Sequence, residues 1–190
     1  MRMFLRKTRV ERDPLAIAMS GVRLGERLLQ IGVDDPAVLG ALAAKVGLSG
    51  HAAVITLDER SAERAGQGIA DASTLADVIV TRDGTLPFDE GTFDVAVVHS
   101  ATGLLAFLDA EVRARLLQHV RHATRSGGRV IVTEAGVRSG VAAMFAPAPK
   151  RDEQYESAGG TVAALQVAGF KPVRVLADRD GLRFIEGLKS

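Results

Sequence analysis

Glycine and carboxylate residues follow short apolar runs in this sequence, at a spacing suited to binding a sugar. Gly32 follows the run Leu28–Ile31, and Asp58 follows a second apolar run. In nucleotide-binding α/β units, an acid for ribose hydroxyls stands roughly 20 residues after the glycine loop, which is near the spacing here. A carboxylate has several lone-pair sites and accepts two neighbouring hydroxyls well. These residues indicate a ribose site, although Asp58 could instead be a solvated acid or a helix cap.

Two more polar positions end apolar runs further along the chain. Asp83 and Gly84 follow one run, and His99 and Ser100 end another. The Asp83 carboxylate could accept the amine of a purine base, or it could only shape an Asp-Gly turn. His99 could act as a general base, since imidazole titrates near neutral pH, or it could be a satisfied polar residue at a strand end. Both alternatives stay open for each residue.

The loop after Gly32 carries the start signals of a helix. Asp35 can be the N-cap, and Pro36 suits the first helical position, where a missing N–H costs nothing. The neighbouring Asp34 has two interpretations. Together with Asp35 it could face a cationic ligand group, or both acids could only cap the helix.

The elements that position these residues alternate between strand and helix. Continuous apolar runs predict buried parallel strands, and 3.6-residue periodicity predicts the helices between them. A hairpin around residues 178–181 closes the chain. The sequence therefore predicts an α/β three-layer Rossmann-like sandwich, with a mostly parallel seven-stranded sheet and an antiparallel C-terminal hairpin. Strands are expected at 27–31, 52–57, 77–81, 93–99, 129–134, 171–177 and 182–186, and helices at 15–20, 37–46, 61–69, 109–123 and 161–168.

Composition narrows the class of protein. The chain has 190 residues, no cysteine and a net charge of +1, so we expect a single domain over 1–190, no nucleic-acid partner and a cytoplasmic location. No apolar stretch reaches the roughly 20 residues that cross a bilayer. Residues 1–20 are expected to form a basic N-terminal arm and a helix. The basic part is either a surface arm for an anionic membrane or RNA, or a solvated tail or short helix lying on the domain. We prefer the second interpretation because the basic run is short and acids interrupt it.

Other candidate residues indicate no chemistry. His119 and His122 lie three residues apart beside several arginines, a pattern more typical of a basic solvated helix face than of a metal site, so no metal is expected. Tyr155, the single tyrosine, is expected in a late loop, where it is either part of a lid or, as we prefer, a plain surface residue.

An ordered set of motifs resembles the class I S-adenosylmethionine-dependent methyltransferases over about residues 20–188. The matching pieces are Leu28–Gly32, Asp58, Asp83-Gly84, Leu86-Pro87-Phe88, Gly91–Val95, Ser126–Val130 and Gly169-Phe170. The resemblance implies S-adenosylmethionine as cofactor, a small-molecule substrate as methyl acceptor, and a catalytic role for His99 as the one candidate. The cofactor-binding residues it implies are Gly32, Val33, Asp34, Asp58, Glu59, Asp83, Gly84, His99 and Ser100.

Three residues of the glycine loop depart from that family's pattern. Gln30 stands where the family has an acid, and Asp34 and Pro36 stand where it has glycines. These departures motivate an alternative, a methyltransferase-like binding or assembly module without catalysis. A nicotinamide-dependent oxidoreductase is a third hypothesis, but it needs a fuller glycine fingerprint and a further substrate domain.

Overall fold

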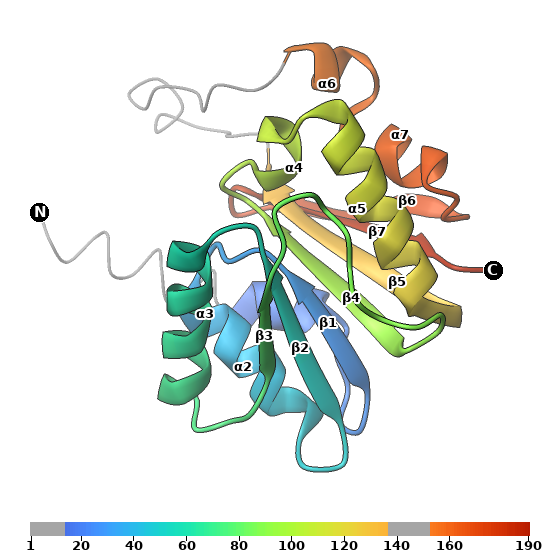
Figure 1. Cartoon of the computed structure of the whole chain (residues 1–190). Coiled ribbons are helices and arrows are strands. Elements are labelled where there is room, and N and C mark those ends of the chain that lie inside the picture. Colours follow the sequence, from blue (N-terminus) through green and yellow to red (C-terminus); the bar gives the residue numbers. More distant parts are fainter. Residues whose placement is uncertain (1–13, 137–152) are drawn as a thin grey trace, which may run out of the picture.

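The computed structural model describes residues 14–136 and 153–190 (Figure 1). The strands are β1 (Arg27–Ile31), β2 (His51–Thr56), β3 (Asp77–Val80), β4 (Phe93–Ser100), β5 (Thr124–Ala135), β6 (Val173–Arg179) and β7 (Leu182–Leu188). The helices are α2 (Pro36–Val46), α3 (Glu59–Asp71), α4 (Leu104–Phe107), α5 (Ala110–Ala123), α6 (Glu153–Ser157) and α7 (Gly160–Val167). Residues 14–19 are also helical.

The seven strands form one sheet in the order β3-β2-β1-β4-β5-β7-β6. Strands β1 to β5 run parallel, and β7 lies antiparallel to both β5 and β6. The predicted mostly parallel sheet with an antiparallel C-terminal hairpin is therefore confirmed. The strand order reverses between β1 and β4, which is the place where open α/β sheets bind ligands.

Helices cover both faces of the sheet and bury its apolar residues. On one face, α2 packs Val38, Leu42 and Val46 against the inner strands, and α3 joins it. On the other face, Leu105 of α4, Leu116 of α5 and Leu165 of α7 share one large core, as the layers in Figure 1 show. These two helical layers and the sheet make the predicted three-layer sandwich.

Two glycines let α2 and α3 touch backbone to backbone. A Cβ atom at Gly40 would overlap the carbonyl oxygen of Gly68, and a Cβ atom at Gly68 would overlap that of Pro36. Glycine is a poor helix former, so Gly68 on its own weakens a helix. Its packing role explains its presence, and the close contact holds the last turns of α3 against the first turns of α2.

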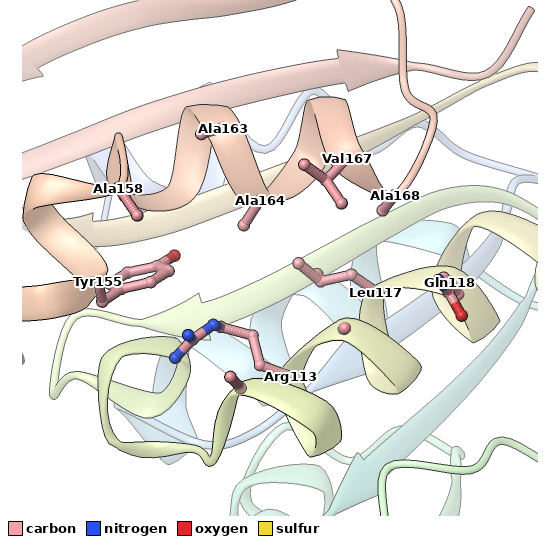
Figure 2. A pocket seen from close by; sticks show the side chains of 12 residues that line it. Arg113, Leu117, Gln118, Tyr155, Ala158, Ala163, Ala164, Val167 and Ala168 are labelled. Carbon is pink, nitrogen blue, oxygen red and sulfur yellow. The ribbon is translucent and has the colours of Figure 1, made fainter.

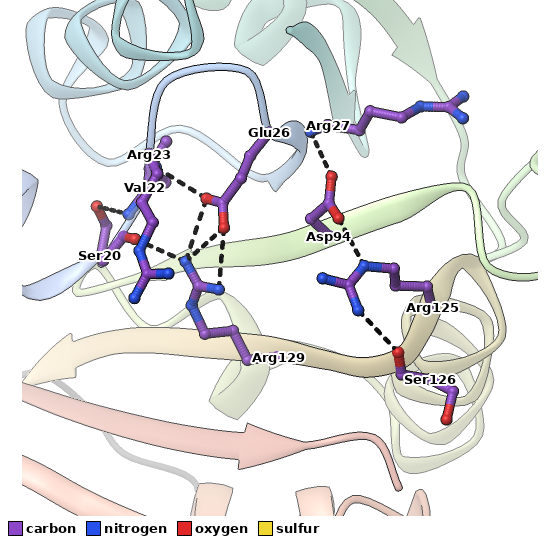
Figure 3. A network of polar contacts seen from close by, with 10 residues as sticks. Ser20, Val22, Arg23, Glu26, Arg27, Asp94, Arg125, Ser126 and Arg129 are labelled. Atoms are coloured by element: carbon purple, nitrogen blue, oxygen red, sulfur yellow. Dashed lines mark hydrogen bonds and ion pairs between the residues drawn. The ribbon is translucent and has the colours of Figure 1, made fainter.

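Paired charges tie the chain together at the amino ends of the strands (Figure 3). Arg129 of β5 pairs with Glu26 at 3.2 Å and also donates to the Gly21 carbonyl at 2.6 Å. Asp94 of β4 accepts from Arg125 at 2.6 Å and from the Arg27 amide at 2.8 Å. The segment before β1 and the β5 strand are thereby joined at the edge of the sheet where the parallel strands begin.

Several boundaries differ from the sequence prediction. Helix α3 begins at Glu59 rather than Ser61, because Asp58 and not Ser61 is its N-cap. Strand β5 extends back to Thr124, since it pairs with β4 across a register shift. Helices α4 and α6 were not expected, because elements of four or five residues show no periodicity. Residues 146–151, where alternating alanine and proline predict a loop, and the basic residues 1–13 lie outside the described residues.

The interpretation of Tyr155 as a surface loop residue is wrong. It lies in α6 and is only 5% exposed. The described residues include no helix long and apolar enough to cross a membrane.

Candidate functional site

A cavity of about 280 Å³ opens at the carboxyl ends of β1, β2 and β4. It lies beside the point where the strand order reverses. Four residues predicted from the sequence line it, namely Gly32, Val33, Asp58 and His99. Helix α3 adds Ser61 and Arg64, and the segment after β4 adds Thr102, Leu104, Phe107 and Leu108. The structure therefore brings together the ends of the strands that the sequence had singled out.

Gly32 is in close contact with the segment after β4. Its φ of +75° is left-handed, and a Cβ atom there would stand 2.7 Å from Leu104 Cδ2 and 3.1 Å from the His99 carbonyl oxygen. No other residue type meets both requirements without strain. A methyl group of Leu104 thus lies on the open surface of Gly32.

The Asp34 carboxylate joins the loop after β1 to the loop after β4. It accepts hydrogen bonds from the Ala101 amide at 2.6 Å, the Thr102 amide at 3.0 Å and the Thr102 hydroxyl at 2.6 Å. Asp34 therefore does not cap α2, a role that falls to Asp35 through the Ala37 amide. This Asp34 clamp is made only of neutral donors, and Asp34 does not line the cavity.

Asp58 lines the cavity and caps α3 at the same time. Its Oδ1 accepts from the Ser61 amide and its Oδ2 from the Ser61 hydroxyl, both at 2.8 Å. These hydrogen bonds lower the pKa of the Asp58 carboxyl below its usual range. The group is ionised at neutral pH, and each oxygen keeps lone-pair capacity for a further donor.

Arg64 is a cavity residue that the sequence analysis missed. From α3 it donates to the carbonyls of Val33 at 3.0 Å and Asp34 at 2.8 Å, which fixes the loop after β1. Nothing in the local sequence distinguishes it from other helical arginines. Its role depends on the close approach of α2 and α3.

His99 is bonded beneath the loop rather than left free. Its Nε2 lies 2.9 Å from Oε1 of the buried Gln30, whose Nε2 donates to the Leu39 carbonyl at 3.1 Å. Because Gln30 uses its amide N–H on Leu39, its oxygen accepts from His99 Nε2–H. Burial lowers the pKa of His99. The negative charges of Asp34 and Asp35 act in the opposite direction but have the smaller effect. The ring is thus neutral, with Nε2 committed to Gln30.

The remaining predicted cofactor residues stand outside this cavity. Asp83 accepts from the Thr85 amide and from the hydroxyls of Thr81 and Thr85, and these bonds lower its pKa to about 2. Gly84 packs against α5, and the Ser100 hydroxyl accepts from the Leu105 amide at 3.0 Å. Glu59 lies in the first turn of α3. Their roles toward a cofactor stay predictions, because none of these four residues lines the cavity.

A groove of about 180 Å³ lies between α5 on one side and α6 and α7 on the other (Figure 2). The Arg113 guanidinium stands 4.3 Å from the centre of the Tyr155 ring at one end. The Tyr155 hydroxyl lies 2.8 Å from Thr161 Oγ1, and Thr161 in turn donates to Glu134 Oε2. Burial raises the pKa of Tyr155 to about 12, so the phenol stays protonated. The rest of the groove is lined mainly by alanines.

The helix α5 has a partly solvated basic face, on which Arg115 and His122 are exposed, and three of its arginines also bond to backbone. Arg113, Arg115 and Arg121 donate to backbone carbonyls of Leu105, Asp83 and Gly169 respectively. They hold neighbouring loops against the helix. Among the described residues, no group of three or more acidic, histidine or cysteine side chains could hold a metal ion.

The chain is similar in structure to several methyltransferases. It superposes on a SAM-dependent methyltransferase from Aquifex aeolicus with a TM-score of 0.71 at 15% identity, covering 92% of this chain and 88% of that one. A TehB-like SAM-dependent methyltransferase from Corynebacterium glutamicum gives a TM-score of 0.60 at 14% identity, covering 92% and 87%. PigF with SAH gives 0.58 at 16% identity, covering 86% and 51%, so this chain spans about half of PigF.

Neither a protein-family model nor a curated protein sequence matches the chain. At such identities the similarity concerns the fold. The chain has the class I S-adenosylmethionine-dependent methyltransferase fold, as the motif order predicted.

Proposed function

We propose that this chain is an S-adenosylmethionine-dependent methyltransferase that acts on a small-molecule acceptor. The observation that carries the proposal is the cavity at the strand reversal, where Gly32, Asp58 and the end of β4 meet. When bound, S-adenosylmethionine supplies a methyl group already activated by its sulfonium, so catalysis requires positioning more than acid–base chemistry.

The cavity residues fit the nucleoside half of this cofactor. The ionised Asp58 carboxylate has acceptor capacity for two ribose hydroxyls beyond its bonds to Ser61. Phe107 and Leu108 of the cavity lining provide an apolar surface for the base and exclude water. The volume of about 280 Å³ stands near the lower end of the range for small-molecule sites.

The charge near the cavity suits a cationic ligand centre. The Asp34 carboxylate is bonded by two amides and one hydroxyl, and it forms no ion pair with a described residue. The Arg64 guanidinium in the cavity lining bonds to the Asp34 backbone carbonyl and not to this carboxylate, and Thr102, which donates to the carboxylate, also lines the cavity. A sulfonium is favoured beside such a group over a neutral thioether.

Calorimetry with S-adenosylmethionine tests the proposal. The folded chain should bind it, and Asp58→Ala should weaken binding by about 1–3 kcal/mol because ribose hydroxyls lose their acceptor. Asp71→Ala is the control, since Asp71 lies at the other end of α3, accepts a hydrogen bond from Gln67 and stands outside the cavity. No binding at millimolar ligand, or equal losses in both variants, would contradict the proposal.

We do not favour the alternative, a binding or assembly module without catalysis. Its support is the internal use of Gln30 and Asp34 and the position of Leu104 over Gly32. A measured transfer of a methyl group to any acceptor excludes it.

A further inference from the structure

The two halves of the cavity differ in how open they are. At one end, Asp58 and Ser61 of the α3 start line the cavity with their polar groups. At the other end, the Cδ2 methyl group of Leu104 covers Gly32. It lies only 2.7 Å from the position that a Cβ atom of Gly32 would take. The polar half is thus available to a ligand, whereas the glycine surface is already in contact with a side chain of the protein itself.

The backbone that carries Leu104 is fixed by hydrogen bonds on both sides. The amides of Ala101 and Thr102 donate to Asp34, and the Leu105 amide donates to the Ser100 hydroxyl at 3.0 Å. The Gly103 amide donates to the Ser100 carbonyl at 2.9 Å. With this backbone held, rotation of the Leu104 side chain is the direct way to uncover Gly32.

We propose that Leu104 is a specificity-determining residue that competes with the 5′ substituent of an adenosyl ligand for the surface of Gly32. The inference rests on the proposed function, in which Asp58 accepts the ribose and the rest of the ligand extends over Gly32. A bare nucleoside leaves Leu104 in place. A ligand with an amino-acid substituent must displace it, and its apparent affinity is reduced by the fraction of the protein in which Leu104 is already turned away.

The Leu104→Ala variant separates these two kinds of ligand. Calorimetry on the full chain would compare S-adenosylmethionine with adenosine. The variant should bind S-adenosylmethionine about tenfold more tightly, while adenosine binding stays within about twofold of the unchanged chain. Leu104→Val, which keeps part of the side chain, should give an intermediate ratio and provides the test if the alanine variant does not fold.

Leu108→Ala is the matched control. Leu108 lines the same cavity, and the same side-chain atoms are removed, but Gly32 stays covered by Leu104. Its ratio of the two affinities should equal that of the unchanged chain.

The outcomes separate this inference from the proposed function. Equal ratios in the Leu104 and Leu108 variants, with S-adenosylmethionine still bound, would overturn the role of Leu104 and leave the proposed function standing. If no variant binds either ligand, the proposed function fails and the inference fails with it.

Discussion

Two acidic residues at the amino end of the sheet and three at its carboxyl end have different kinds of partner, although Glu134 at the carboxyl end of β5 does pair with Arg183. At the amino end, Glu26 and Asp94 are each paired with an arginine. At the carboxyl end, Asp34, Asp58 and Asp83 accept only from amides and hydroxyls. Neutral donors orient a carboxylate without cancelling its charge, whereas an arginine does both.

The difference separates a stabilising region from a binding region. The Glu26–Arg129 pair is largely withdrawn from water, with side-chain exposures of 15% and 17%, and it joins the first strand to the fifth. The carboxyl end holds the cavity and keeps a negative charge beside it. Substitutions at the amino end should therefore change the free energy of unfolding, and those around the cavity should change ligand binding.

The largest expected effect concerns the amino end. Glu26→Gln keeps an acceptor for Arg129 but leaves a mostly buried guanidinium without its counter-charge, so it should lower the free energy of unfolding by about 3 kcal/mol. Urea denaturation measures this value. The double variant Glu26→Gln with Arg129→Met removes the unpaired charge and should regain part of the loss. A single variant as stable as the unchanged chain would contradict the comparison.

A smaller effect is expected at the Asp34 clamp. Asp34→Ala removes three hydrogen bonds to one carboxylate and should lower the free energy of unfolding by about 2 kcal/mol. Hydrogen exchange of the Ala101 and Thr102 amides should become faster in the same variant. Asp34→Asn retains an acceptor oxygen and should be intermediate. Unchanged protection of these two amides would show that the clamp does not join the loops in solution.

The smallest effect is the titration of Asp83. Its pKa in the folded chain is lowered to about 2 by hydrogen bonds from Thr85 and Thr81, below the ordinary value of 3.8. A carboxyl with a lowered folded-state pKa stabilises the fold above pH 3.8, and this contribution is lost as the pH falls toward 2. NMR titration should find the Asp83 midpoint near 2 and move it upward in Thr85→Ala. A titration midpoint for Asp83 at the ordinary value of 3.8 would show that the hydrogen bonds from Thr81 and Thr85 do not form in solution.

The fold could be predicted from the sequence because local signals agree with the tertiary structure. The apolar runs of β1, β2 and β4 are buried on both faces, and the Asp35-Pro36 start of α2 was read from the helix-cap rules. The short separation of the last two apolar runs indicated their hairpin.

The site could be predicted only in part, because its contacts join distant segments. Asp58 and Gly32 end strands, so topology alone places them at one edge. Neither the bond from Ala101 to Asp34 nor the contact of Leu104 with Gly32 has a local signal, since each joins residues about 70 positions apart. Gln30 stands in place of the family's acid for a reason visible only in three dimensions, since its amide donates to the Leu39 carbonyl, which an ionised acid could not do.

A crystal structure of the chain with S-adenosylmethionine tests the central claim most directly. The account predicts an adenosyl group in the cavity, with ribose hydroxyls within hydrogen-bond distance of Asp58 and the Leu104 side chain turned away from Gly32. An empty cavity at saturating ligand, or a ligand bound elsewhere with Asp58 untouched, would contradict it.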